Sequence, residues 1–103
     1  MSAKVKSVYE ELAFANADEM LIKARLVMEI ADQIKRRHLT QSDAATLLGF
    51  PQPKLSNVLR GQFRGVSERK LMSCLTKLGR DIQIVVTAAP RSRREGRISV
   101  AVA

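Results

Sequence analysis

Side chains able to contact nucleic acid are concentrated in residues 50–66, where a short helical pattern follows a Gly-Phe-Pro turn. The amides of Gln and Asn make bidentate contacts to adenine, Lys and Arg donate to guanine or to phosphate, and Ser bonds to either. No Asp or Glu interrupts this stretch, so its surface is compatible with phosphates. The pattern predicts that the helix reads the major groove of DNA through Gln52, Lys54, Ser56, Asn57 and Arg60.

The elements that must hold this helix form a predicted helix-turn-helix. Such a motif needs a small residue where its two helices cross, a turn residue able to adopt positive φ, and apolar residues on the inner face of the second helix. Counted from Gln41, the small residue is Ala45 and the turn residue is Gly49. Leu55 and Val58 supply the inner face, which leaves the polar side chains outside.

Two further helices are predicted around the motif. Asn16 and Glu19 have the spacing of a capping box, which predicts that residues 1–15 form an arm and that a helix runs from here to about residue 37. Ser67 is a suitable cap for a helix that ends near Gly79. The apolar face expected for the first of these helices consists of Met20, Ala24, Val27, Ala31 and Ile34. That of the second consists of Leu71, Cys74, Leu75 and Leu78.

The period of the pattern changes after residue 80. Apolar residues then alternate with polar ones in two runs, 82–86 and 97–102, on either side of an Arg-rich connection. This predicts a C-terminal β-hairpin. Because an isolated two-stranded hairpin is marginal in water, we expect its apolar face to pack on the helices or on a second copy, and we favour a homodimer. The predicted organisation is an arm (1–15), a DNA-binding domain (16–80) and a dimerisation hairpin (81–103).

Composition narrows the class of protein. The 103 residues carry a net charge of +8, and residues 51–103 hold eleven basic against three acidic side chains, whereas residues 1–50 hold seven of each. This basic half favours a polyanionic partner, nucleic acid first. One cysteine excludes an internal disulfide, and no apolar run is long enough to span a bilayer, so a cytoplasmic location is expected. One His and one Cys assemble no catalytic or metal-binding set, so we expect neither an enzyme nor a cofactor.

The runs LTQSDAATLLGF and PKLSNVLRGQFRGVSERKLMSCLTKLGRDIQIVV resemble the Xre/Cro-like helix-turn-helix regulators, and more closely their HigA-type antitoxin-like branch. The resemblance implies a mainly α fold, a four- or five-helix λ-repressor-like bundle followed by the C-terminal β-hairpin. It further implies a homodimer that binds operator DNA and represses its own operon. By motif position, Gln41 would contact phosphate or orient Gln52.

Several alternatives remain open from the sequence. Arg64 is a candidate phosphate contact, although an arginine in a loop is often an ordinary surface charge. The cluster Arg91–Arg97 could contact DNA or an acidic protein, or serve only solubility. The main alternative function is an antitoxin that covers a RelE/HigB-like toxin. A third is general nucleic-acid or RNA binding, against which the 4% aromatic content argues.

Overall fold

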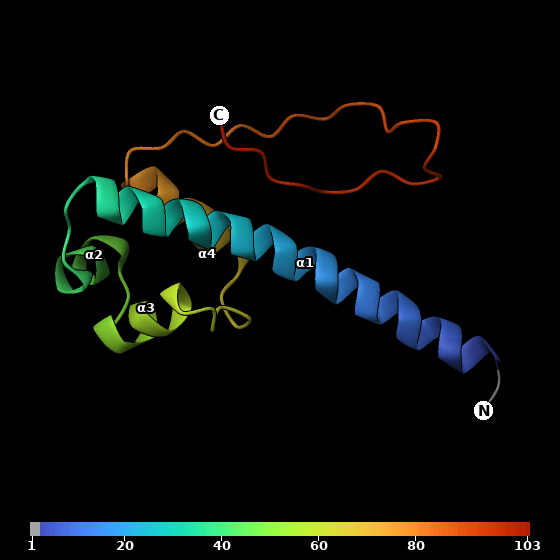
Figure 1. The fold of residues 1–103 in the computed structure, drawn as a ribbon, viewed down its shortest axis with the longest axis horizontal. Helices are drawn as coiled ribbons and strands as arrows, with labels where there is room; N and C mark the ends of the chain where they lie inside the picture. Colours follow the sequence, from blue (N-terminus) through green and yellow to red (C-terminus); the bar gives the residue numbers. More distant parts are fainter. Residues whose placement is uncertain (1–2) are drawn as a thin grey trace.

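The computed structural model describes the backbone of residues 3–103 and the side chains of residues 17–103. Within these residues the chain forms four helices, which are α1 (Ala3–Arg36), α2 (Gln41–Leu48), α3 (Gln52–Leu59) and α4 (Glu68–Lys77). Helix α1 runs along the longest dimension of the molecule, and the three shorter helices pack against its C-terminal part (Figure 1). The predicted mainly α fold is confirmed.

Helix α1 starts much earlier than predicted. It is continuous from Ala3 to Arg36 and passes through Asn16 without a break, so the predicted start at Asn16 is wrong. The segment 3–36 contains no Gly or Pro to interrupt helical hydrogen bonding, which outweighs a local capping pattern. Glu19 instead forms an ion pair with Lys23, one turn further on. The side chain of Asn16 is not among the described ones. The division of the chain into an arm (1–15), a DNA-binding domain (16–80) and a dimerisation segment (81–103) stays a prediction.

His38 ends helix α1. Its φ of 54° lies in the left-handed region, where the chain can leave the helix and turn back. The backbone N–H of Leu39 donates to the carbonyl of Ile34 at 3.1 Å, and that of His38 donates to Lys35 at 3.1 Å. These bonds satisfy carbonyls that the end of the helix would leave unpaired. The side chain of His38 is exposed, as expected for a loop residue.

The predicted caps of the shorter helices are confirmed. Thr40 accepts a hydrogen bond from the N–H of Asp43 at 3.0 Å, and Ser67 accepts one from the N–H of Lys70 at 3.1 Å. Pro51 and Pro53 stand at the start of α3, where a missing amide hydrogen costs no helical bond. Local signals therefore determine where α2, α3 and α4 begin.

All four helices and the loop before α4 contribute to one apolar core. The predicted faces of α3 and α4 are buried in it, whereas the predicted face of α1 is only partly correct: Val27 and Ile34 are buried, but Ala31 is exposed. The helix is rotated so that Leu26 and Ile30 point inward. The buried set is Leu26, Val27, Ile30, Ile34, Ala44, Ala45, Leu48, Leu55, Val58, Phe63, Val66, Leu71, Cys74, Leu75 and Leu78.

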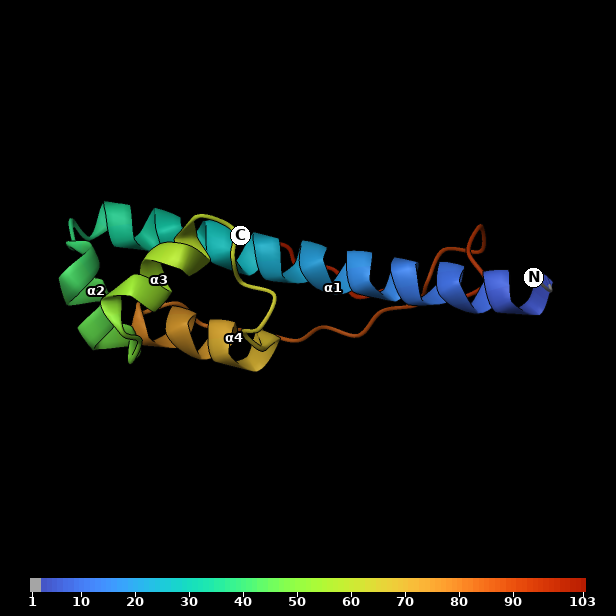
Figure 2. The same ribbon diagram turned by 90° about the horizontal axis from the view of Figure 1, so that it is seen from below.

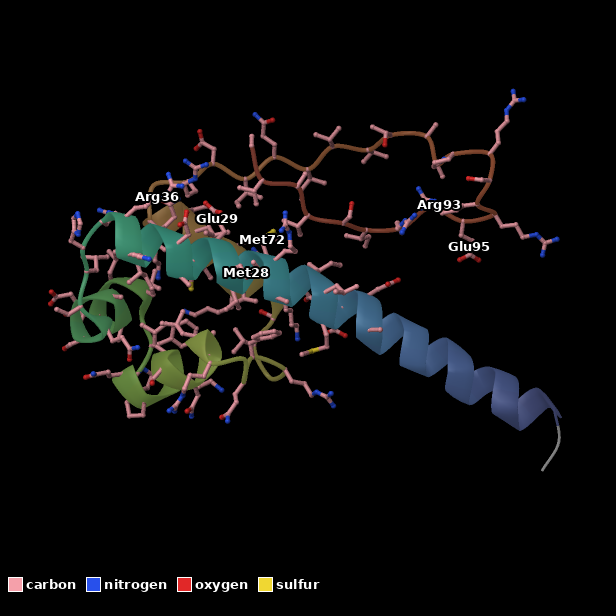
Figure 3. All side chains as sticks on the ribbon, viewed as in Figure 1. Met28, Glu29, Arg36, Met72, Arg93 and Glu95 are labelled. Atoms are coloured by element: carbon pink, nitrogen blue, oxygen red, sulfur yellow. The ribbon has the colours of Figure 1, made fainter. Side chains whose placement is uncertain are left out.

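The predicted C-terminal β-hairpin is wrong as a strand pair, because residues 80–103 contain no strand. The segment is extended and folds back on itself, with Arg93 and Glu95 near its far end (Figure 3). Between residues 81 and 103 the one backbone hydrogen bond lies at this reversal, from the N–H of Arg93 to the carbonyl of Pro90 at 3.0 Å. Two strands without a surface to pack on are marginally stable. In this segment Val100, near the C-terminal end, packs against the core of the helices.

The molecule is elongated. Its radius of gyration is 16.7 Å and its longest extent is 51 Å, whereas a compact chain of this length has a radius near ~13 Å. The N-terminal half of α1 and the folded-back C-terminal segment account for the difference, since both extend beyond the bundle in two perpendicular views (Figures 1 and 2). None of the described helices combines the length and apolar character needed to cross a bilayer.

Candidate nucleic-acid interface

The helix-turn-helix predicted from the sequence is present as α2, a short turn and α3. Ala45 is 3% exposed where the two helices cross, and Gly49 has a φ of 75° at the end of α2. The N–H groups of Gly49 and Phe50 both donate to the carbonyl of Ala45, at 2.9 and 3.0 Å. Leu55 and Val58 are each 1% exposed on the inner side of α3. The features that define the motif are therefore confirmed, and together they fix the angle at which α3 leaves the turn.

The outer side of α3 carries the predicted DNA-contacting residues. Gln52, Lys54 and Arg60 are exposed, and Ser56 and Asn57 are partly exposed. Because Leu55 and Val58 are anchored in the core, these polar side chains are presented on one side of a rigid helix rather than on a loop. The segment 50–66 has no carboxylate, so nothing within it repels a phosphate backbone.

Two of these residues contact each other. The Arg60 guanidinium donates from Nη2 to Asn57 Oδ1 at 2.7 Å, one turn apart at the C-terminal end of α3. A charge-assisted bond of this length orients both side chains. It leaves the Nδ2 hydrogens of Asn57 and the remaining guanidinium hydrogens available as donors.

The other two predicted residues lie outside α3. Gln41 is the first residue of α2, and its side chain is exposed. Arg64 lies in the loop between α3 and α4, and its side chain is also exposed. Neither Gln41 nor Arg64 has a side-chain hydrogen bond among those described, and the expectation that Gln41 contacts phosphate or orients Gln52 stays a prediction.

Lys70 supports the turn, a role that the sequence did not indicate. Its Nζ donates to the carbonyl of Leu48 at 3.3 Å and lies 4.9 Å from the centre of the Phe50 ring. The ammonium thus satisfies a carbonyl at the C-terminal end of α2, where positive charge is favourable, and also makes a cation–π contact. Leu48 and Lys70 are 22 positions apart, and no sequence signal could have shown that they meet.

Lys23 is the second residue that the sequence analysis missed. It is 4% exposed and is the one charged residue buried among the described side chains. Its Nζ donates to the carbonyl of Arg64 at 2.8 Å and pairs with Glu19 Oε1 at 3.1 Å. The Glu19–Lys23 spacing of four residues could have indicated the ion pair, but not the bond to a loop 41 residues away.

Three other features of the described side chains bear on function: possible metal ligands, the thiol of Cys74 and a hollow on the surface. Residues 17–103 bring no three His, Cys, Asp or Glu side chains into an arrangement that could hold a metal ion. Cys74 is a buried residue of α4, and burial raises the pKa of its thiol, an effect that Lys70 and Lys77 partly offset. A shallow hollow lined by Arg25, Met28, Asp32 and Val102 lies along the exposed side of α1.

Comparison with known proteins agrees with this geometry. The family model described as "Helix-turn-helix domain" matches residues 8–87, well over half of the chain. One solved structure, assigned to the XRE family of transcriptional regulators, is 40% identical with a TM-score of 0.77, and the match covers 84% of this chain and 98% of that one. No curated protein matches the chain. The chain therefore belongs to the XRE family of helix-turn-helix transcriptional regulators.

Proposed function

We propose that this chain is a sequence-specific DNA-binding transcriptional regulator that represses its own operon as a homodimer. The observation that carries the proposal is the two-sided character of α3. Its inner side is anchored by Leu55 and Val58, each 1% exposed, and its outer side holds amide, hydroxyl and cationic groups without a carboxylate. Membership of the XRE family supports the same function.

We assign different roles to the residues of the interface. Those on α3 approach base edges, because a recognition helix enters the major groove with its exposed side. Gln41 at the start of α2 and Arg64 after α3 contact phosphates on either side of that helix. Phosphate contacts supply affinity without sequence preference, whereas base contacts supply specificity. The residues assigned to base edges are Gln52, Lys54, Ser56 and Asn57, with Arg60 beside them.

The C-terminal segment supports the homodimer. Ile84, Val86 and Ile98 are 83%, 91% and 76% exposed. The described part of their own chain does not cover these apolar side chains. Their burial against a second copy would remove this apolar surface and offer partners to the unpaired backbone groups of residues 81–103. A dimer would place two α3 helices on half-sites about one helical turn apart, roughly 34 Å.

Selection from a random duplex library tests the function. The purified chain is expected to enrich a two-fold symmetric sequence, and the same sequence is expected upstream of its own reading frame. In fluorescence anisotropy at several salt concentrations, the enriched duplex should bind at least ~10³ times more tightly than a scrambled one. Equal and steeply salt-dependent binding to both duplexes would leave only a basic surface and contradict the proposal.

The antitoxin-like branch and a toxin partner stay predictions that rest on the sequence resemblance. A toxin-sized basic protein encoded next to this chain would support them, and an unrelated neighbour would count against them.

A further inference from the structure

The contact between Lys23 and the loop after α3 stands out among the polar contacts of the described residues. A lysine is rarely buried, and its ammonium must then be paired. Lys23 meets this need with Glu19 Oε1 at 3.1 Å and with the carbonyl of Arg64 at 2.8 Å. A charged group in the middle of α1 is thus bonded directly to the backbone of a residue that we assign to phosphate.

The loop around Arg64 is a tight turn with well-defined ends. Phe63 and Val66 are 8% and 5% exposed, so both ends of the turn are held in the core. The N–H of Val66 donates to the carbonyl of Phe63 at 3.0 Å, which makes Arg64 and Gly65 the two central residues of a β-turn. The side chains at both ends point inward, whereas that of Arg64 is exposed.

The peptide between Arg64 and Gly65 is the variable part of such a turn. Types I and II differ by rotation of this central peptide, and type II needs positive φ at its third residue, which glycine permits. Gly65 does not have positive φ here, unlike Gly49, Gly61 and Gly79. The bond from Lys23 holds the carbonyl of this peptide, so it selects one of two orientations that Gly65 would otherwise allow.

We propose that Lys23 is a positioning residue for DNA binding: it locks the Arg64–Gly65 peptide with its carbonyl turned towards α1, so that the opposite N–H of Gly65 faces outward beside the Arg64 side chain that contacts a phosphate. The inference rests on the proposed function and on the role assigned there to Arg64. Without Lys23 the turn can exchange between two forms. In the flipped form the Arg64 carbonyl replaces the Gly65 N–H on the outward side, where it repels the phosphate that Arg64 contacts, and the phosphate contact weakens.

Binding of a fixed mixed-sequence duplex, measured by anisotropy as a function of salt, tests the proposal. Lys23→Met keeps the aliphatic stem but removes the bond to the carbonyl. It should weaken binding about three- to tenfold, and the slope of log K against log salt should fall by up to ~0.9, the value for one phosphate. Arg64→Ala should have a similar effect, and the double variant should lose little more than either single one. Glu19→Gln is the matched control, since it removes the ion pair and leaves the carbonyl bond.

Gly65→Ala separates positioning from simple stabilisation. A Cβ at Gly65 would meet no atom within 4 Å, and the residue lacks positive φ, so alanine fits while disfavouring the flipped turn. In the Lys23→Met background it should restore most of the lost affinity, which a purely structural role of Lys23 would not predict. In the wild-type background it should bind equally well or more tightly. A loss of affinity there would overturn the proposal whether or not Lys23→Met folds.

The remaining outcomes distinguish this inference from the proposed function. Fully additive losses in the double variant, or no rescue by Gly65→Ala, would overturn the role of Lys23 alone. Unchanged affinity and salt slope for Arg64→Ala would do the same. A wild-type chain that binds no duplex at all would overturn both the proposed function and the inference.

Discussion

Arg60 donates from Nη2 to Asn57 Oδ1 at 2.7 Å, so the two side chains at the C-terminal end of α3 form one unit. A free Asn amide can offer both a donor and an acceptor to adenine, but one of the two lone pairs of Asn57 Oδ1 is already engaged by Arg60. Most of the hydrogen-bonding groups that the pair still has free are N–H donors. Such a set matches the O6 and N7 acceptors of guanine better than the mixed edge of adenine.

A coupled loss is therefore expected at these two positions. Asn57→Ala and Arg60→Ala should each weaken binding to the selected operator by about 1–3 kcal/mol, and the double variant should lose clearly less than the sum. A double-mutant cycle by anisotropy measures the coupling. Replacement of the guanine nearest to the pair should reduce binding by wild type but change little for the double variant. Additive losses would show that the two side chains act separately.

Gln52→Ala and Arg64→Ala should differ in which DNA they affect. Gln52 is exposed at the start of α3 and is assigned to a base edge, so its loss should weaken operator binding and leave scrambled DNA almost unchanged. Arg64→Ala should weaken both duplexes by about the same factor. Titration of both variants against both duplexes at one salt concentration provides the comparison. Equal losses on the two duplexes for Gln52→Ala would remove it from base reading.

The exposed apolar residues of the C-terminal segment give a test of the homodimer. The double substitution Ile84→Asp with Val86→Asp should leave the monomer folded, because these side chains are 83% and 91% exposed and outside the core. It should abolish the dimer, since burial of unpaired carboxylates is costly. Sedimentation velocity reports the oligomeric state. Thr87→Asp is a control for added charge on the same segment, and a double variant that stays dimeric would exclude residues 84–86 from the interface.

Lys70→Met should destabilise the helix-turn-helix. The substitution removes the bond to the carbonyl of Leu48 and the cation–π contact with Phe50, which together should lower the free energy of unfolding by ~1–2 kcal/mol. Thermal or urea denaturation followed by circular dichroism measures the change. Arg69→Met, one residue earlier on an exposed side of α4, is the matched control and should change stability very little. Equal effects of the two substitutions would assign no special role to Lys70.

Cys74 should be protected in the folded chain. Burial raises the pKa of its thiol above the ordinary value, so little thiolate is present at neutral pH and reagents cannot reach it. Labelling with a thiol-specific disulfide reagent should be slow until denaturant is added. A raised pKa in the folded state also means that this thiol favours folding below its unfolded pKa of ~8.5 and loses that contribution as pH rises further. A serine variant should show a smaller fall in stability between neutral and alkaline pH.

The sequence alone determined the helix-turn-helix and most of the candidate interface. The caps at Thr40 and Ser67, the turn at Gly49 and the inner residues Leu55 and Val58 depend on contacts within a few positions of the chain. Such signals are local, so they can be recognised before any tertiary structure is known. Once the inner side of α3 was identified, its outer side followed from the helical period.

Tertiary structure decided the features that depend on residues far apart. The rotation of α1 was ambiguous from sequence, because apolar residues occupy more than one side of the helix, and packing against α4 selected the side with Leu26 and Ile30. The alternating pattern after residue 80 predicted strands, but strands need a partner surface that this chain alone does not offer. The bonds from Lys23 to Arg64 and from Lys70 to Leu48 join elements that meet only when the bundle forms.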